Sequence, residues 1–563
     1  MSQFTGFSVS TPSRHPANQK AYDSTRHQYQ EDYVNPKFWD ILLHPSLKIL
    51  IGEEDNGRPI FDVNIASLEW KVKQVNGSFE ETFHRNISSS ILKTTVRIPA
   101  QGEYEITFQV NFTNGSSESN TRKYNFRDFL IVSIGDSFAS GQGNPDIPTT
   151  SSIEHKAKCK ATTITLSLTK LKESIEKFLA GVKEEVKDKI QEYIPFLGKI
   201  AVAQINSVED VIGFLKGQVA DLKDAIVDVG KVGVGLAVEG AEEVASWFGF
   251  GDGGESDEVK PRPAGWQEPH AYRSYRSGHS LAARQIEMKS NTDRITFLSF
   301  ARTGSEIKDG LLGPRTIDPN FLGTESLDNR SIDGWTRNRG QVEEVKDTLQ
   351  GRPIDALIIS IGVNDLGFST LTSDSIFWEA GEKRKERIAS TKKKIEEDFP
   401  ENLQLLKNAI ESQLNPKKVF ITEYPVGVFS EIETQGPCGI LGVKDRPVLG
   451  KGFLDLDTED AKALGKLGRT LNNKIREKAH EFGWILIDGI VAGFVGHGYC
   501  SEKSYFVFAE ESCLNQGDFE GMLHPNKLGH EVARDCIAQA LHRELIILEE
   551  EKWLEPMLYV MMS

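Results

Sequence analysis

Five short apolar runs that alternate with helical patterns constrain the fold of this chain most strongly. The runs are rich in β-branched and aromatic residues, as buried strands are, and they cover residues 129–134, 295–300, 356–361, 418–422 and 484–488. Helical patterns lie between them, including 383–414 and 460–481. Strands that alternate with helices build βαβ units. The sequence therefore predicts an α/β domain with a doubly wound parallel sheet over residues 128–146 and 270–545.

A serine follows the first of these runs in a turn that opens a helix. Ser137 stands in Gly135-Asp136-Ser137-Phe138, with small residues after it, and a Gly-Asp pair at such a place marks a tight turn. At the carboxyl end of a strand and the N-terminus of a helix, main-chain N–H groups can stabilise a developing oxyanion. A serine that merely caps the helix is also common there. The turn alone leaves a nucleophile and an N-cap as alternatives.

Three later segments place further polar groups where a strand gives way to a loop. Gly304 follows the second strand-like run, Asn364 follows the third, and His524 precedes a C-terminal helical pattern. Loops at the carboxyl ends of parallel strands meet at one edge of a sheet. A glycine N–H, an amide donor, a hydroxyl nucleophile and an imidazole base are the groups that acyl transfer requires. We expect these three residues and Ser137 to lie in one crevice.

The ordered set resembles the SGNH (GDSL-type) hydrolase family, whose four named residues are a Ser, a Gly, an Asn and a His in this chain order. The resemblance implies a flavodoxin-like sheet and a serine esterase or lipase activity. It also implies that Ser137 is the nucleophile and His524 the general base. The oxyanion hole implied by the family consists of the main-chain amides of Ser137 and Gly304 and the side chain of Asn364.

The segment around the histidine departs from the family pattern. The family commonly has Asp three residues before the histidine, and Gly521 stands there. A catalytic imidazole needs an acceptor on its second nitrogen, and some members of the family use a main-chain carbonyl. We therefore expect a Ser–His dyad in which a main-chain oxygen near Gly521 or Met522 orients His524. The carboxylates of Asp518 and Glu520 are the alternatives.

Two aspartates adjoin the expected site. Asp136 precedes Ser137, and Asp365 follows Asn364. Aspartate in a turn commonly accepts hydrogen bonds from loop N–H groups. We expect this structural role for both, in preference to an electrostatic role in the reaction.

A period-two alternation of apolar and polar residues distinguishes residues 35–127. Leu68, Trp70 and Val72 form one such run, and Asn-Gly turns separate the runs. This spacing indicates short antiparallel strands. We expect a small β-sandwich that resembles immunoglobulin and fibronectin modules, preceded by a flexible polar arm at 1–34. Support of the α/β domain and binding of a carbohydrate or a partner are its alternative roles.

A long stretch at 147–269 interrupts the predicted α/β domain. Apolar residues recur in it at helical spacing between Lys and Glu, which indicates amphipathic helices. Three interpretations stay open: a helical subdomain that packs its own apolar faces, a lid over the crevice, or contact of the Gly-rich apolar piece at 229–250 with a lipid interface. The last predicted unit is a tail at 546–563.

Composition and short motifs limit the partners and cofactors. The formal net charge of −16 argues against a nucleic-acid partner, because phosphate binding needs clustered Lys and Arg. The sequence contains no run of about 18 apolar residues, so we do not expect a membrane-spanning helix. The start of the chain lacks the apolar core of a secretory signal, so we expect a cytoplasmic location, with secretion as the alternative. Walker, His-Glu-x-x-His and paired Cys-x-x-Cys motifs are missing from the sequence, and we expect no metal or nucleotide cofactor.

The cysteines allow two interpretations. Their odd count of five favours free thiols on composition alone. The family resemblance makes a disulfide between Cys500 and Cys513 conceivable, since these residues flank a short loop ahead of His524.

The expected function is hydrolysis of a small-molecule ester. The apolar insertion favours a lipid-like acyl chain, whereas the β-module favours an acylated glycan as substrate. A non-catalytic binding protein that retains the hydrolase fold is the alternative from another class. The four residue types in the family's order argue against it, because a decayed site has no chemical reason to keep all of them.

Overall fold

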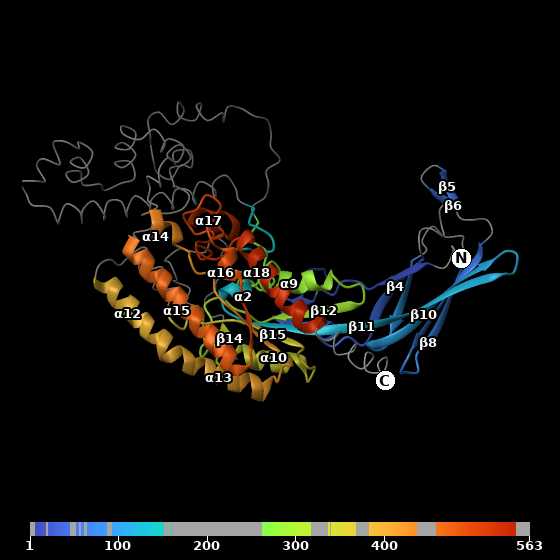
Figure 1. Ribbon diagram of the computed structural model, residues 1–563, viewed down its shortest axis with the longest axis horizontal. Coiled ribbons are helices and arrows are strands. Elements are labelled where there is room, and N and C mark those ends of the chain that lie inside the picture. Colours follow the sequence, from blue (N-terminus) through green and yellow to red (C-terminus); the bar gives the residue numbers. More distant parts are fainter. Residues whose placement is uncertain are drawn as a thin grey trace, which may run out of the picture.

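The computed structural model contains a β-rich part and an α/β part (Figure 1). The structure describes residues 6–18, 21–45, 52–55, 58–60, 65–86, 93–150, 159, 262–316, 336–337, 339–367, 382–435 and 458–547. The expected helical insertion at 147–269 and the expected tail at 546–563 therefore lie largely outside the described residues.

A parallel sheet of five described strands forms the centre of the α/β part. They are β11 (Ser117–Gly135), β12 (Asp293–Ser299), β15 (Ala356–Ser360), β16 (Val419–Thr422) and β17 (Ile485–Ile487). Their order is β12-β11-β15-β16-β17, and every neighbouring pair is parallel. In chain order this is 2-1-3-4-5, the order of flavodoxin-like sheets. The predicted parallel α/β sheet is confirmed, and all five predicted strands are present.

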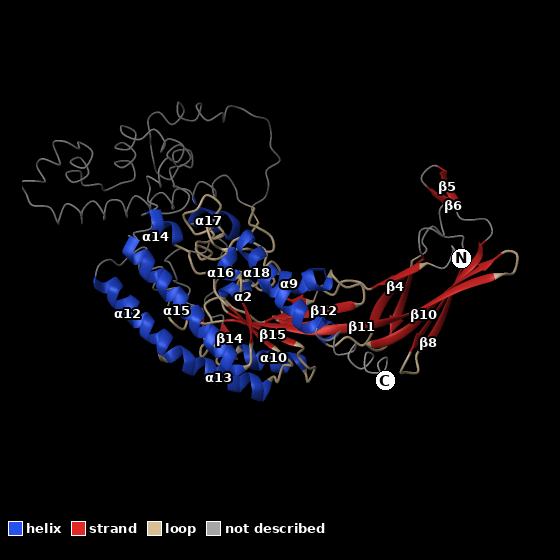
Figure 2. Ribbon diagram, in the orientation of Figure 1, coloured by secondary structure: helices blue, strands red, loops and turns tan. Residues whose placement is uncertain are grey.

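Helices cover both faces of this sheet. All seven residues of β12 and all five of β15 are buried, as the strands of a sheet covered on both faces are. Figure 2 shows α9 (Gly278–Glu287) and α18 (Lys527–Leu541) on one side of the strands and α10 (Gln341–Leu349) and α13 (Asp398–Gln413) on the other. Further helices are α2 (Ser137–Ser140), α12 (Glu382–Glu396), α14 (Ser430–Gln435), α15 (Thr458–Phe482), α16 (Ile490–Gly493) and α17 (Ala509–Gln516).

The long helical pattern at 383–414 forms two helices. α12 ends at Glu396, and α13 begins at Asp398. Pro400 lies in the first turn of α13. In a continuous helix its ring would collide with the carbonyl group of Glu396, and proline has no N–H to donate. The proline therefore accounts for the break, whereas the pattern at 460–481 forms the single helix α15.

The β-rich part consists of two antiparallel sheets. One contains β1 (Phe7–Ser10), β4 (Trp39–Pro45) and β9 (Thr94–Ile98), and the other contains β8 (Glu80–Asn86), β7 (Ile65–Gln74), β10 (Gly102–Phe112) and the first half of β11. Burial alternates along β7 and β10. Inward residues of both sheets, among them Ile41, Trp70 and Phe108, share one apolar core. The alternation in the sequence corresponds to this alternating burial.

Strand β11 belongs to both parts of the molecule. Up to Phe126 it pairs antiparallel with β10, and from Arg127 it pairs parallel with β12. Arg127 also forms two hydrogen bonds with the carboxylate of Asp293, at 2.7 and 2.9 Å. The domain boundary expected at 127/128 therefore falls inside one continuous strand, and no linker separates the parts.

The expectation of a flexible arm at 1–34 is wrong for the described residues. The segment contributes β1 to the β-rich part, and two of its tyrosines are buried against β12. The Tyr29 hydroxyl donates to the carbonyl oxygen of Ser299 at 3.0 Å and accepts from its N–H at 2.7 Å. Tyr33 does the same with Phe297, at 3.2 and 3.1 Å. Because β12 is the edge strand of the parallel sheet, these hydroxyls satisfy main-chain groups that would otherwise be unpaired.

Short helices and short strands complete the regular structure of the described residues. The helices are the 3-10 turns η1 (Pro16–Asn18) and η4 (Pro269–Ala271), the α-helix α1 (Glu31–Val34) and the π-helix η6 (His542–Ile547). The strands are β2 (Tyr22–Asp23), β3 (Gln28–Tyr29), β5 (Gly52–Asp55), β6 (Arg58–Ile60), β13 (Arg315–Thr316) and β14 (Thr336–Arg337), which pair two by two.

Candidate active site

Ser137 lies at the point where β11 gives way to a helix. β11 ends at Gly135, and Ser137 is the first residue of α2. Gly135 has a φ of 145°, and a Cβ atom there would collide with the carbonyl oxygen of Ser360 on β15. Only glycine allows this approach. Ser137 therefore follows the place where the strand order reverses, between β11 and β15, which is where open α/β sheets bind ligands.

Asp136 caps α2 and is held by a buried tyrosine. Its Oδ1 accepts from the N–H of Phe138 at 3.0 Å, and its Oδ2 accepts from the hydroxyl of Tyr424. Burial raises the pKa of Asp136 to about 7 because it disfavours the charged form. The main chain of Tyr424 is in turn bonded to Asn472 by two hydrogen bonds of 2.9 Å. Asp136 thus has the loop-bonding role that the sequence predicts.

Asn364 bonds to the residue that follows Gly304. Nδ2 of Asn364 donates to the carbonyl oxygen of Ser305 at 3.0 Å, and Asn364 is buried. An amide nitrogen carries two hydrogens, so one is left for a second acceptor. Gly304 has a φ of 66°, and a Cβ atom there would lie 2.5 Å from Nη2 of Arg315. The structure brings the loops after β12 and β15 together at these two residues.

Asp365 fixes the same two loops to each other. Its carboxylate accepts from the main-chain N–H of Ile307 at 3.0 and 3.2 Å. Burial raises the pKa of Asp365 to about 7, and the charges of Glu306 and Asp136 act in the same direction. This is the structural role predicted for Asp365.

His524 lies in the loop between α17 and α18 and has a main-chain acceptor. Its Nδ1 is 3.2 Å from the carbonyl oxygen of Met522, and its own N–H donates to the carbonyl oxygen of Gly521 at 3.2 Å. Because a carbonyl can only accept, Nδ1 carries the hydrogen and Nε2 keeps the lone pair of a general base. Burial lowers the pKa of His524 to about 4, so the ring is neutral at pH 7. The preceding Leu523 has a φ of 64°, a conformation that is rare outside glycine and concentrates at functional sites.

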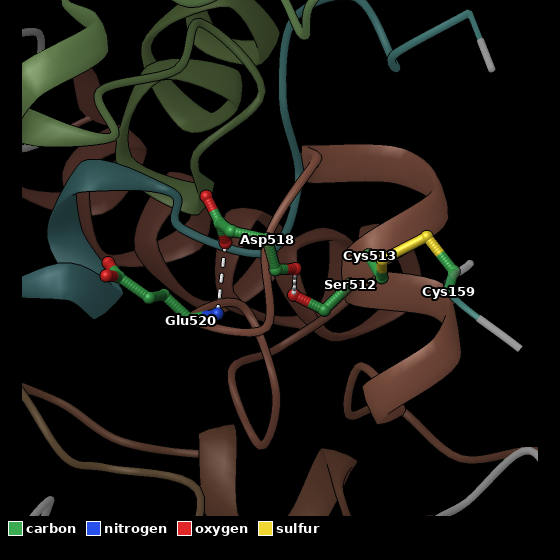
Figure 3. Close-up of a disulfide and its surroundings, with 5 residues drawn as sticks. All are labelled: Cys159, Ser512, Cys513, Asp518 and Glu520. Carbon is green, nitrogen blue, oxygen red and sulfur yellow. Dashed lines mark hydrogen bonds between the residues drawn. A yellow bond between two sulfur atoms is a disulfide. The ribbon is translucent and has the colours of Figure 1, made fainter. Parts of the chain in front are cut away.

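The carboxylate of Asp518 bonds to Tyr272 and to groups of its own loop; Figure 3 shows its bond with the N–H of Glu520. It accepts from the Tyr272 hydroxyl at 2.7 Å, from Nε2 of Gln516 at 2.8 Å and from the N–H of Glu520 at 3.0 Å. Burial and the nearby Asp518 raise the pKa of Glu520 to about 8. The bonds of Asp518 shape the loop that leads to the histidine.

The disulfide expected between Cys500 and Cys513 is wrong. Cys513 on α17 is paired with Cys159, 354 positions away, with their Cα atoms 5.7 Å apart (Figure 3). One sulfur forms one disulfide, and Cys500 is also disulfide-bonded. Free thiols, favoured by the odd count, are therefore wrong for these three residues, and Cys536 is free among the described cysteines. Cys159 and Cys513 pack with Phe519 in a small apolar cluster, a contact that spacing along the chain could not reveal.

The loops of Ser137 and His524 contact each other directly. Nε2 of Gln142 donates to the carbonyl oxygen of Glu520 at 2.8 Å. Gly143 packs so closely that a Cβ atom there would lie 3.1 Å from Cβ of His524. The Ser137 hydroxyl and the His524 ring, both described, are not hydrogen-bonded to each other; such bonds commonly tighten only when substrate binds. The structure thus joins the loops of all four predicted residues and leaves the Ser–His bond itself unformed.

Sequence reasoning missed two buried residues that hold these loops. Tyr424 follows β16, and its place after a strand-like run was the available signal. Gln142, between two glycines behind α2, carries no signal in a single sequence, because its contacts come from distant loops.

Comparisons with known proteins gave similarities to solved structures. No protein-family model and no curated protein matches the sequence. An extracellular lipase from Streptomyces rimosus is 18% identical, with a TM-score of 0.34, over 48% of this chain and 89% of the lipase. Phospholipase A1 from Streptomyces albidoflavus NA297 is 17% identical, with a TM-score of 0.33, over 48% and 89%. A family two carbohydrate esterase from Clostridium thermocellum is 9% identical, with a TM-score of 0.25, over 96% and 99%.

Two further findings concern the described residues. Among them, no helix combines the length and the apolar character that crossing a membrane requires. The same residues contain no group of three or more His, Cys, Asp or Glu side chains with the arrangement of a metal site.

Proposed function

We propose that the protein hydrolyses carboxylic esters through an acyl-enzyme formed on Ser137. The Ser137 oxygen forms a bond to the acyl carbon while its proton passes to Nε2 of His524. The ester C–O bond then breaks, and the leaving alcohol takes that proton. Water attacks the acyl-enzyme with His524 again as base, and the acid is released with Ser137 restored.

An oxyanion hole accompanies this mechanism. The negative charge on the acyl oxygen would be bound by the main-chain N–H groups of Ser137 and Gly304 and by the second hydrogen on Nδ2 of Asn364. The bond from Nδ2 to Ser305 holds that amide in place, so it needs no reorganisation during the reaction. Asp365 supports the same arrangement through Ile307.

A dyad suffices for this chemistry. The carbonyl oxygen of Met522 fixes the tautomer of His524, which is the task of the third residue in a triad. The bonds of Asp518 to Tyr272, Gln516 and Glu520 assign that carboxylate to the loop.

One observation supports the proposal above all others. Three loops at the carboxyl edge of the parallel sheet and the histidine loop are joined by hydrogen bonds in a chain, and each carries one of the residues that acyl transfer needs. A helix cap alone would not require an imidazole with a free Nε2 and an amide donor on the loops that are joined to its own.

A fluorophosphonate probe tests the proposal. The probe should label wild type and Ser140→Ala, the next serine of the same helix, and should spare Ser137→Ala. His524→Ala should react far more slowly, because the hydroxyl then lacks its base. Equal labelling of wild type and Ser137→Ala would show that another residue reacts and that Ser137 is not the nucleophile. No labelling of wild type would favour the non-catalytic binding protein.

The substrate is a second question with its own measurement. A lipid-like ester, a short-chain ester and an acetylated sugar are the alternatives. Comparing kcat/KM for short acyl esters, long acyl esters and acetylated sugars would decide between a lipase and a carbohydrate esterase.

A further inference from the structure

Gln142 is a buried amide at the centre of the joined loops. It follows α2, and only 2% of its surface is exposed. A buried polar side chain is costly unless it is hydrogen-bonded, so the partners of Gln142 show what it is used for.

Three polar groups of Gln142 bond to the segments that carry Ser137, Gly304 and His524. Its main-chain N–H donates to the carbonyl oxygen of Ser137 at 3.2 Å. Its Nε2 donates to the carbonyl oxygen of Glu520 at 2.8 Å, four residues before His524. Its Oε1 accepts from the hydroxyl of Thr303, the residue before Gly304. One residue therefore contacts the segment of Ser137 (the nucleophile loop), the segment of Gly304 (the oxyanion loop) and the segment of His524 (the base loop).

The chemistry of these partners requires an amide. The carbonyl oxygen of Glu520 can only accept, so the nitrogen of Gln142 must face it, and the oxygen must then face Thr303. Glutamate in its charged form would offer no donor to Glu520, and an apolar side chain would offer neither group.

The neighbouring residue strengthens the contact between the same loops. The N–H of Gly143 donates to Oε1 of Gln516 at 3.1 Å, and Nε2 of Gln516 donates to Oδ1 of Asp518 at 2.8 Å. Asp518 also accepts from the N–H of Glu520 (Figure 3). Gln142 and Gly143 thus both hold the base loop. Of these two neighbouring residues, Gln142 also bonds to the oxyanion loop, through Thr303.

We propose that Gln142 is a positioning residue that sets the distance between Ser137, the Gly304 amide and His524. This inference rests on the proposed esterase function. The residue touches no substrate. Gln142 affects the rate through the position of these groups, because an error of about 1 Å in the placement of reacting groups can lower the rate by about 10²-fold.

Gln142→Met tests the inference, because methionine keeps the length of the side chain and removes both polar groups. The matched control is Gln267→Met, another buried glutamine, whose Nε2 donates to the Tyr29 hydroxyl at 2.9 Å away from the four site residues. We expect Gln142→Met to lower kcat by up to about 10²-fold with KM nearly unchanged. Gln267→Met should keep kcat, even if its unfolding midpoint falls as much.

Two further variants separate the contacts and keep the test decisive if Gln142→Met folds poorly. Gln142→Glu keeps the acceptor for Thr303 and loses the donor to Glu520, and Thr303→Val removes the oxyanion-loop contact alone. Each should lose part of the kcat that Gln142→Met loses. Unchanged kcat in both, in protein with wild-type circular dichroism, would overturn the inference.

Amide hydrogen exchange measures the same role without activity. In Gln142→Met, peptides covering 518–526 should exchange faster than in wild type and in Gln267→Met. If wild type proved inactive yet this exchange rose, the esterase proposal alone would fail. If the enzyme were active and neither kcat nor exchange distinguished Gln142→Met from Gln267→Met, the positioning role alone would fail.

Discussion

Gly143→Ala should displace the base loop through a single added methyl group. In wild type, a Cβ atom at this position would lie 2.9 Å from Cγ2 of Val507, 3.0 Å from the carbonyl oxygen of Pro525 and 3.1 Å from Cβ of His524. Ordinary contacts are about 3.5–4.0 Å, so these neighbours must move by several tenths of an ångström. Gly143 also has a φ of 89°, which an alanine adopts only at a cost.

Two contributions to the destabilisation can be separated by a control. A left-handed alanine costs roughly 1–2 kcal/mol, and overpacking a tight site typically adds about 1–3 kcal/mol. Gly115→Ala is the matched control, because Gly115 has a φ of 82° and a Cβ atom there would meet nothing within 4 Å. Gly115→Ala therefore carries the cost of a left-handed alanine and not the cost of overpacking.

Denaturant unfolding and ester hydrolysis together measure the effect. Gly143→Ala should lose more stability than Gly115→Ala, and it should lose about tenfold or more in kcat because His524 moves. Gly115→Ala should keep wild-type kcat. Equal stability and equal kcat in the two variants would refute the close contact between residue 143 and the histidine.

Three other predictions concern the site and the sheet edge. Asn364→Ala should lower kcat by about 10²–10³, the usual cost of one oxyanion donor, while exposed Asn408→Ala should not, and a near-normal rate for Asn364→Ala would contradict its role. The kcat/KM for a neutral ester should stay constant from neutral pH down to about pH 5 and should fall as the pH drops through about 4, because protonated His524 cannot accept the serine proton. A fall in kcat/KM that is already centred near pH 6.5 would show that burial does not lower the pKa of His524. Tyr29→Phe and Tyr33→Phe should each reduce the free energy of unfolding by about 1–3 kcal/mol, since each leaves a buried main-chain N–H of β12 unpaired; unfolding midpoints equal to that of wild type would contradict the capping of this edge.

Sequence patterns predicted the parts of the fold that depend on local periodicity. The five strands of the parallel sheet are apolar runs that are largely buried, and such runs are visible in the sequence. The split of the helical pattern at 383–414 follows from Pro400, so the sequence alone was sufficient to predict this break. The wrong flexible arm has a different cause. The segment 6–34 carries no long period because its contacts are scattered: β1 joins the β-rich sheet over four residues, and Tyr29 and Tyr33 bond to the edge of β12.

Contacts between distant segments are the part of the candidate site that the sequence did not predict. The order Ser, Gly, Asn, His and the strand ends predicted which loops meet. The Cys159–Cys513 pair and the two side-chain contacts of Gln142 join segments more than 150 positions apart, and nothing in local spacing encodes such pairs. The same holds for the Tyr424 hydroxyl on Asp136.

A crystal structure of the protein after reaction with a fluorophosphonate tests the convergence of the four groups most directly. We expect phosphorus bonded to Oγ of Ser137, with the phosphoryl oxygen about 2.7–3.1 Å from the Gly304 nitrogen and from Nδ2 of Asn364, and with Nε2 of His524 in hydrogen-bonding reach of the Ser137 oxygen. An adduct whose phosphoryl oxygen points away from Gly304 and Asn364, or an unmodified Ser137, would contradict it.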